Sequence, residues 1–287
     1  MNASELKERG FTEEWMDLRG RCLPVYKAGE GPGIVLIHEM PGITPQVVDF
    51  AQFLVDNGFT VWMPYLFARE PGPTGSLNGW GPALRICVSG QLMLLSTGRT
   101  SPLTDWLRAL ARHLHQKRPG PGVGVIGMCF SGGFALATVI EPAVLAPVMS
   151  QPALPFPVSP LRRRAFGLSP SDAIAAGRRI DRDGLCVLGL RFKKDLVVPA
   201  ARFERLRQML KGHFLCCEIP SGRGTGISRW AHSVLTRERT CHPQNKGIQE
   251  AVDTLLRFLD ERLRRAPPIT PPVKGRGSGS PASPAPA

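Results

Sequence analysis

Residues 122–133 read GVGVIGMCFSGG, and this stretch decides the fold. The apolar run VGVIGMC (123–129) is typical of a buried strand, and FALATVI (134–140) is typical of a helix that follows directly. Between them, GMCFSG (127–132) sets small residues around a cysteine, as in a nucleophile elbow. In an elbow a sharp strand-to-helix turn lifts the nucleophile above the sheet, and the helix N-terminus stabilises negative charge there. We therefore predict that Cys129 is a nucleophile.

The same glycines also match a nucleotide-binding pattern. Gly122, Gly124 and Gly127 have the G-x-G-x-x-G spacing of a dinucleotide turn. In that fold the glycines follow the strand, whereas here they lie within it. If the turn is counted from Gly127 instead, Cys129 occupies the position that needs a bare backbone near pyrophosphate. The nucleotide interpretation fails, and we expect no cofactor.

Strand and helix patterns alternate along most of the chain, which indicates an α/β fold with a mostly parallel central sheet and helices on both faces. The further expected strands are 33–39, 59–66, 143–152, 185–192 and 213–220, and the further expected helices are 47–58, 169–180, 202–210 and 247–265. A Pro/Gly-rich loop (71–82) precedes helical stretches that reach about His115. Residues 1–265 are expected to form one domain, and the Pro/Gly/Ser-rich residues 266–287 a disordered tail.

An elbow requires two partners later in the chain, first an acid and then a histidine. Asp195 follows the strand 185–192, and His232 lies between the last strand and the last helix. Both positions fall at the end of the sheet where the elbow opens. We predict that Asp195 orients His232 and that His232 is the base.

Other acids and histidines fit less well. Two aspartates precede their strand, at the wrong end of the sheet, namely Asp181 and Asp183. His242 is the second choice for the base because it lies nearer the last helix. The remaining histidines begin a strand or lie on an arginine-bearing helix, and these are His213, His113 and His115.

His38 and Glu39 follow the apolar run GIVLI (33–37). A carboxylate at the carboxyl end of a buried strand lies beside the predicted site, although an exposed loop charge is the alternative. The backbone N–H groups of Met40 and Phe130 are expected to form an oxyanion hole, because both follow strands that end at this edge.

Four segments of the sequence together resemble the dienelactone hydrolase family of α/β-hydrolases. They are IHEMPG (37–42), GMCFSGG (127–133), DLVVP (195–199) and AHS (231–233), and the resemblance extends over roughly residues 25–265. It implies an α/β-hydrolase fold with Cys129 as nucleophile, His232 as base and Asp195 as its orienting acid. It also implies that Glu39 interacts with the thiol and helps to generate the thiolate when substrate binds.

The chain departs from that family at the arginines that hold a substrate carboxylate. One of them stands a helical turn beyond the catalytic histidine in the family, where this sequence has Thr236 followed by Arg237. Arg85 is a candidate for the other. The segment between elbow and acid is long and contains an Arg-rich stretch (162–182) that we interpret as a lid. Arg85 and Arg237 are the expected substrate-binding residues.

The sequence therefore predicts a hydrolase that cleaves an ester or lactone, of the carboxymethylenebutenolidase type, through a Cys-His-Asp triad. A broad carboxylesterase or thioesterase is the alternative among enzymes, and a hydrolase-fold protein that binds without turnover is the alternative outside them. No metal is expected, because Cys216-Cys217 and Cys241-His242 lack zinc-type spacing. We expect a monomer or small homo-oligomer.

Charge and composition indicate which class of ligand the protein binds and in which cellular compartment it is expected. The net charge of +13 lies entirely in residues 151–287, which favours an anionic small-molecule ester or lactone. The basic runs lack interleaved aromatic residues, so no nucleic-acid partner is expected. Neither a membrane-length apolar run nor a signal-peptide core is present. Seven scattered cysteines favour reduced thiols in the cytoplasm, the six besides Cys129 as small hydrophobes.

Overall fold

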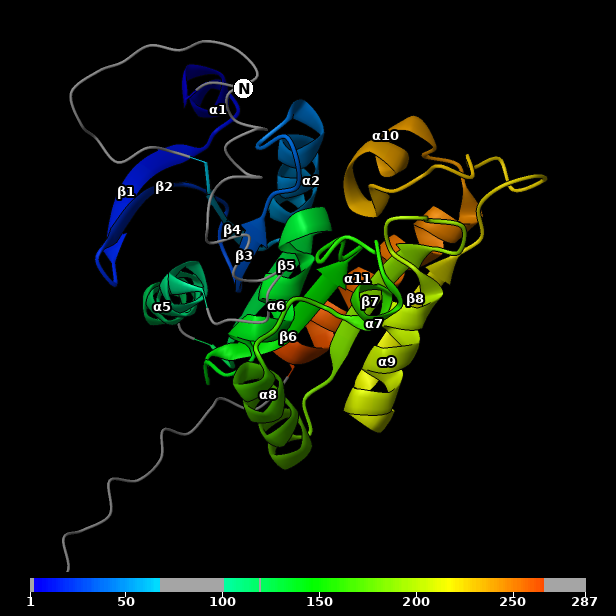
Figure 1. The fold of residues 1–287 in the computed structure, drawn as a ribbon. Coiled ribbons are helices and arrows are strands. Elements are labelled where there is room, and N and C mark those ends of the chain that lie inside the picture. Colours follow the sequence, from blue (N-terminus) through cyan, green and yellow to red (C-terminus); the bar gives the residue numbers. More distant parts are fainter. Residues whose placement is uncertain (1–2, 68–100, 119, 266–287) are drawn as a thin grey trace, which may run out of the picture.

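A computed structural model describes residues 3–67, 101–118 and 120–265. An eight-stranded sheet in the order β1-β2-β4-β3-β5-β6-β7-β8 crosses the molecule (Figure 1). The strands are β1 (Thr12–Leu18), β2 (Arg21–Ala28), β3 (Gly33–Ile37), β4 (Thr60–Pro64), β5 (Val123–Met128), β6 (Val144–Ser150), β7 (Val187–Phe192) and β8 (Phe214–Ile219). From β4 to β8 neighbouring strands run parallel, while β1 and β2 join antiparallel at one edge.

The antiparallel pair β1–β2 was not among the predicted strands. Its two-residue turn is Arg19-Gly20, with φ of 57° and 73°, so both residues adopt the left-handed region that such hairpin turns require. The sequence here lacks the Asn-Gly or Asp-Gly signal that usually marks this turn. The other predicted strands are present within a few residues of their expected bounds.

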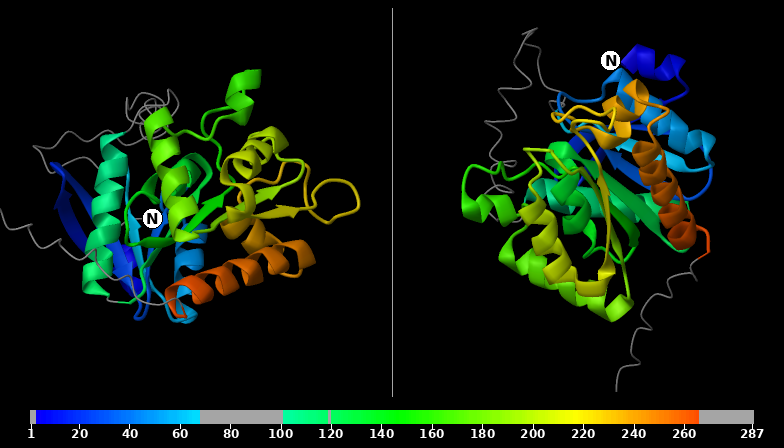
Figure 2. Two further views of the ribbon diagram at one scale, coloured as in Figure 1. Left: turned by 90° about the horizontal axis from the view of Figure 1, so that it is seen from below. Right: turned by 90° about the vertical axis from the view of Figure 1, so that its right-hand side faces the viewer.

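Helices cover both faces of the sheet because the central strands bury side chains on both sides (Figure 2). On one face α2 (Pro45–Asp56) and α11 (Lys246–Leu263) pack against alternate residues of the strands, such as Ile34 and Leu36. On the other face α5 (Pro102–Lys117), α6 (Gly132–Thr138), α8 (Pro170–Asp183) and α9 (Ala200–Leu210) share one buried apolar cluster with Val35 and Ile37. The predicted α/β architecture is confirmed.

Shorter helical segments lie at the rim of this core. They are α1 (Ala3–Glu8), η1 (Cys129–Ser131), α7 (Pro160–Arg164), η2 (Lys211–His213), the π-helical turn η3 (Val234–Glu238) and α10 (Arg239–Cys241). The predicted loop at 71–82 and the tail at 266–287 lie outside the described residues. No helix in the described part of the chain is both long and apolar enough to cross a bilayer.

The Arg-rich stretch 162–182 belongs to two different elements. The helix α7 is exposed, whereas α8 packs Ala176 and Ile180 into the sheet-facing core. Ser169 caps α8 as expected, since its Oγ accepts a hydrogen bond from Asp172 N at 3.0 Å. Arg179 is buried and donates to the carbonyls of Val139 and Pro142 beyond α6. The α8 part of this stretch is therefore a core helix, and the lid interpretation does not hold for it.

Candidate active site

The turn after β5 is tight enough to require the small residues that the pattern predicted. Cys129, the first residue of η1, has φ of 54°, a region that is strained for a residue with a side chain. A Cβ added to Gly127 would lie 2.3 Å from Ser131 O, and one added to Gly132 would lie 2.7 Å from Pro152 Cα. Neither distance is compatible with a side chain. Glycines let the backbone close around Cys129 and hold it in the strained conformation.

Ser131 fastens this turn to the neighbouring strand β3. Its buried Oγ accepts a hydrogen bond from Met128 N at 2.9 Å and lies 3.0 Å from Ile37 O, where β3 ends. In the sheet, Ile37 pairs with Gly127. The residues that follow β3 and the residues that follow β5 therefore open at one edge.

Asp195 lies in the turn after β7, and both of its carboxylate oxygens have partners. Oδ1 accepts hydrogen bonds from Val197 N (2.8 Å) and Val198 N (3.2 Å), and Oδ2 lies 2.6 Å from Nδ1 of His232. The backbone amides fix the carboxylate, so its second oxygen is aimed at the imidazole. The structure brings the predicted acid and the predicted base together.

Buried Arg191 stabilises the Asp195 turn from within the sheet. Its Nε donates to Val198 O at 2.9 Å, and one of its terminal nitrogens donates to Lys193 O at 3.1 Å. The guanidinium thus spans the turn on both sides of the acid, and a salt bridge to Glu218 balances its charge. This support was not predicted, although an arginine inside an apolar strand is a visible signal.

The electrostatics of His232 are those of a charged imidazole. Burial lowers the pKa of the ring, but hydrogen bonds to Asp195 and to the Cys129 sulfur, with the negative charges of both partners, outweigh it. Together they raise the pKa of His232 to about 10. The ring lies between a carboxylate and a sulfur, and both partners favour its charged form.

A comparison with protein families assigns this chain. The model of the dienelactone hydrolase family matches residues 21–221, more than half of the sequence. The chain belongs to the dienelactone hydrolase family. The match contains the elbow and Asp195 and stops before His232, which the structure places against Asp195.

Solved structures share the fold of this family member at low sequence identity. A dienelactone hydrolase from Anabaena variabilis is 16% identical, with a TM-score of 0.55 over 88% of this chain and 98% of its own. A dienelactone hydrolase-like promiscuous phosphotriesterase from metagenomic libraries is 15% identical, with a TM-score of 0.56 over 88% and 99%. A serine hydrolase from Xanthomonas campestris is 14% identical, with a TM-score of 0.52 over 90% and 97%. A comparison with curated protein sequences finds no match. These likenesses establish the α/β-hydrolase fold.

Glu39 lies at the same edge but turns to other partners than the thiol. Its Oε1 accepts a short hydrogen bond from Thr236, and its Oε2 accepts from Ser233 Oγ at 2.9 Å and Gln151 Nε2 at 3.1 Å. The carboxylate is buried, so these three donors replace water around its charge. None of the hydrogen bonds that Glu39 makes within the described residues goes to Cys129.

Of the two candidate arginines, the described structure contains Arg237, and its side chain does not meet this carboxylate. Thr236 is fully buried, whereas the next residue, Arg237, is exposed on the other side of η3. Arg85 lies outside the described residues. At the position where the family has an arginine, a neutral hydroxyl therefore faces Glu39.

Of the expected oxyanion donors, Phe130 follows Cys129 directly in the first turn of η1, where an N–H has no carbonyl one turn earlier to bind. Met40 follows β3, whose last residue, Ile37, pairs with Gly127 near the end of β5.

His38 connects the end of β3 to the segment after β4. Its Nε2 accepts a hydrogen bond from Leu66 N at 3.1 Å, and its Nδ1 lies 3.0 Å from Glu39 O. Complete burial lowers the pKa of His38 to about 4.

Gln151 is a site residue that sequence reasoning missed. It follows β6 with φ of 34°, is fully buried, and uses its amide to join Glu39, Val234 N and Ser150. The available signal was the polar pair Ser150-Gln151 at the carboxyl end of an apolar strand.

The other described cysteines are not buried as small hydrophobes would be, since Cys241 is exposed and Cys22, Cys186, Cys216 and Cys217 are partly exposed. In residues 3–67, 101–118 and 120–265, no three His, Cys, Asp or Glu side chains gather as a metal site would require. The described cysteines are free thiols. Burial raises the pKa of the Cys216 thiol to about 11, although Arg207 donates to its sulfur at 3.1 Å. Cys216 therefore differs from Cys129 in its surroundings and its chemistry.

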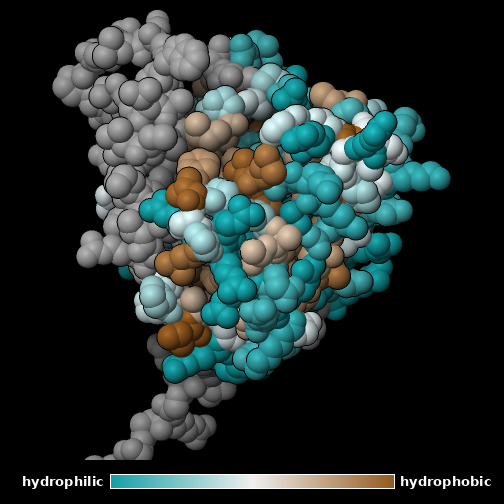
Figure 3. All heavy atoms as spheres, turned by 45° about the vertical axis from the view of Figure 1, so that its right-hand side comes forward, coloured by the Kyte–Doolittle hydropathy of each residue, from teal (hydrophilic) through white to brown (hydrophobic). Residues whose placement is uncertain are grey.

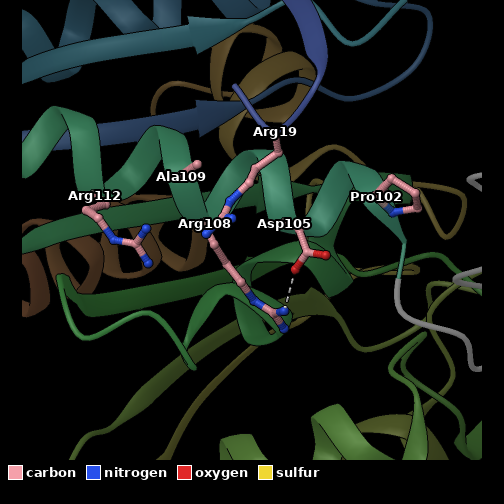
Figure 4. A pocket seen from close by; sticks show the side chains of 6 residues that line it. All are labelled: Arg19, Pro102, Asp105, Arg108, Ala109 and Arg112. Atoms are coloured by element: carbon pink, nitrogen blue, oxygen red, sulfur yellow. Dashed lines mark hydrogen bonds and ion pairs between the residues drawn. The ribbon is translucent and has the colours of Figure 1, made fainter. Parts of the chain in front are cut away.

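An arginine-lined hollow of about 430 Å³ lies between the β1–β2 turn and α5 (Figure 4). Its lining residues are Arg19, Pro102, Asp105, Arg108, Ala109 and Arg112. Arg108 pairs with Asp105 at 2.9 Å and with Asp172 at 3.0 Å, and Arg112 pairs with Glu141 at 2.5 Å. Most of the positive charge is thus neutralised within the fold, and we assign no function to this hollow.

Exposed apolar side chains form separate spots among hydrophilic residues on the face shown in Figure 3. The large exposed apolar side chains in the segments that follow β6, β7 and β8 are Phe156, Val158, Leu161, Ile174, Leu196 and Trp230. Scattered exposed side chains of this kind are ordinary on protein surfaces.

Proposed function

We propose that this member of the dienelactone hydrolase family hydrolyses a carboxylic ester or lactone with Cys129, His232 and Asp195. The observation that carries the proposal is the chain of contacts from Asp195 Oδ2 to His232 Nδ1, 2.6 Å, and from the ring to the Cys129 sulfur. A nucleophile, a base and an orienting acid in this order are what nucleophilic acyl transfer requires.

In the first half of the reaction the Cys129 thiolate attacks the carbonyl carbon and forms a C–S bond. The backbone N–H groups of Phe130 and Met40 stabilise the resulting oxyanion. The C–O bond to the leaving group then breaks, and the His232 imidazolium gives its proton to the departing alkoxide. For a lactone, the alcohol stays attached to the acyl chain.

In the second half His232 is neutral and acts as a base. It removes a proton from water, and the hydroxide attacks the thioester carbonyl. The C–S bond breaks, which releases the carboxylic acid and restores the thiolate–imidazolium pair. Asp195 holds the ring in the tautomer that both steps need.

The exposed side chain of Arg237 and the neutral side chain of Thr236 indicate which substrate charge the site accepts. A guanidinium that binds a substrate carboxylate tightly lies where water is excluded, and Arg237 does not. We therefore propose that the reaction extends to neutral esters and lactones, and that the positive charge of residues 151–287 gives anionic substrates a weak, salt-sensitive advantage.

The test is hydrolysis of 4-nitrophenyl acetate and a panel of simple lactones by the purified protein. Cys129→Ala is expected to abolish turnover, while Cys216→Ala and Cys241→Ala retain most of it. Iodoacetamide is expected to inactivate the enzyme by alkylating Cys129, as read by mass spectrometry. A Cys129→Ala protein with near-normal kcat would refute the assignment.

A further inference from the structure

The Glu39 carboxylate connects three separate parts of the active-site edge. Glu39 follows β3, Gln151 follows β6, and Ser233 and Thr236 belong to the segment that enters and forms η3. All four residues are buried or partly buried. Three donors converge on one carboxylate, and its two oxygens accept all three hydrogen bonds.

The segment held by this carboxylate is the one that carries the catalytic histidine. His232 is followed directly by Ser233, and Val234 N donates to Gln151 Oε1 at 3.4 Å. Glu238 N donates to Ser233 O at 3.0 Å, which closes the π-helical turn over Thr236. The backbone on the C-terminal side of His232 is thus attached to β3 and β6, while its ring is attached to β7 through Asp195.

The contacts of Glu39 point away from a direct action on sulfur. Both of its oxygens accept hydrogen bonds from this network, and a carboxylate that moved to the thiol would leave three buried donors without their acceptor. The resemblance to the family assigns Glu39 to the thiolate. The geometry of this chain, with a neutral hydroxyl at Thr236, assigns it to the backbone beside His232.

We propose that Glu39, Gln151, Ser233 and Thr236 form a positioning network that holds the His232 ring against the Cys129 sulfur. The proposal rests on the proposed function for its catalytic meaning. The network moves no proton. It fixes the place of the imidazolium, and its loss lets the ring drift from the sulfur while Asp195 still holds Nδ1.

The central experiment compares Thr236→Val with Thr236→Ser. Valine keeps the shape and removes the donor to Glu39, whereas serine keeps the donor. Thr236→Val is expected to lower kcat about tenfold with little change in KM, as the loss of one hydrogen bond to a buried charge does. Thr236→Ser is expected to retain most of the activity. The matched control is Thr240→Val, which removes a hydroxyl one turn later that bonds Thr236 O and not Glu39.

A double-mutant cycle separates a network from independent roles. Glu39→Ala removes both acceptor oxygens, and Glu39→Ala/Thr236→Val is expected to be no slower than Glu39→Ala alone, because the contact that Thr236→Val removes is already absent. The upper limb of the kcat/KM profile against pH is expected to move to lower pH in Thr236→Val, since a loosened ring loses part of its contact with the sulfur. Additive losses, or a Thr236→Val profile identical to that of the wild type, would overturn the proposal.

Alkylation of Cys129 by iodoacetamide provides a readout that does not depend on any substrate. At pH 6 the alkylation rate is expected to fall about tenfold or more in Thr236→Val and to stay near wild type in Thr236→Ser and Thr240→Val. Thermal melting confirms that each variant is folded. If the wild type hydrolyses no ester but alkylation follows this pattern, the proposed function fails and the network stands. If esters are hydrolysed and alkylation is equal in all variants, the network fails alone.

Discussion

The end of β3 and the loop before η3 each place a histidine at the same edge of the sheet, and the two imidazoles are held in opposite charge states. His38 is completely buried among Tyr65, Phe67 and Phe130, and its pKa is lowered to about 4. His232 is also largely enclosed, yet its pKa is raised to about 10. The difference comes from the partners. His38 meets a backbone carbonyl and a backbone amide, whereas His232 meets a carboxylate and a sulfur.

The largest effect is expected when His232, the histidine with the raised pKa, is removed. His232→Ala is expected to lower kcat by on the order of a hundredfold or more, the scale of general acid–base catalysis. His242→Ala is the control, because that side chain pairs with Glu238 at 3.4 Å and lies away from Asp195. Steady-state kinetics on an aryl ester measures both. A larger loss in His242→Ala would move the base to His242.

The second prediction concerns the removal of the partner that keeps the ring charged. In Asp195→Asn the pKa of His232 is expected to fall from about 10, so the upper limb of kcat/KM is expected to shift toward neutral pH. The sign also applies to folding. A pKa raised above that of the unfolded chain stabilises the fold fully below about pH 6.5, and this contribution is lost as pH rises toward 10. An upper limb that does not move would show that the carboxylate does not set the charge of the ring.

The third prediction concerns how His38, the histidine with the lowered pKa, affects the free energy of unfolding at different pH values. Because the pKa of His38 is lower in the folded state than in the unfolded chain, its contribution is complete above about pH 6.5 and is lost as pH falls toward 4. The free energy of unfolding is expected to drop by on the order of 1 kcal/mol per pH unit in that interval. His38→Gln is expected to flatten the slope, measured by urea denaturation at several pH values. An unchanged slope in His38→Gln would refute the prediction.

The smallest effect is expected at the exposed arginine. Arg237→Ala is expected to change the ratio of kcat/KM for an anionic lactone and its neutral methyl ester by less than about twofold, since the guanidinium is in water. The ratio is measured at low and high salt. A tenfold loss of preference that persists at high salt would place Arg237 at the substrate.

The residues of the candidate triad could be located from the sequence because topology decides where they lie. Cys129, Asp195 and His232 each follow a strand that ends at the same edge, and chain order alone assigns their roles. The pair Thr236 and Arg237 shows where this reasoning stops. Adjacent residues of a helical turn point about 100° apart, so the turn decides which side chain faces the site. The π-helical geometry of η3 comes from tertiary contacts and leaves no local sequence signal.

Gln151 and the β1–β2 pair were missed for different physical reasons. The amide of Gln151 matters only because β3 and η3 bring Glu39 and Val234 to it, and those contacts are remote in sequence. The hairpin depends on Arg19 in a left-handed conformation, which its residue type does not favour.

The positive φ of Cys129 has a consequence for how selection acts on this position. Glycine would occupy this backbone conformation without strain, so Cys129→Gly is expected to relieve about 1 kcal/mol at the turn. A lineage released from selection for turnover would thus gain stability by giving up its sulfur. Selection for stability alone would therefore favour glycine at position 129. A cysteine retained there among descendants of this chain would indicate continued selection for catalysis.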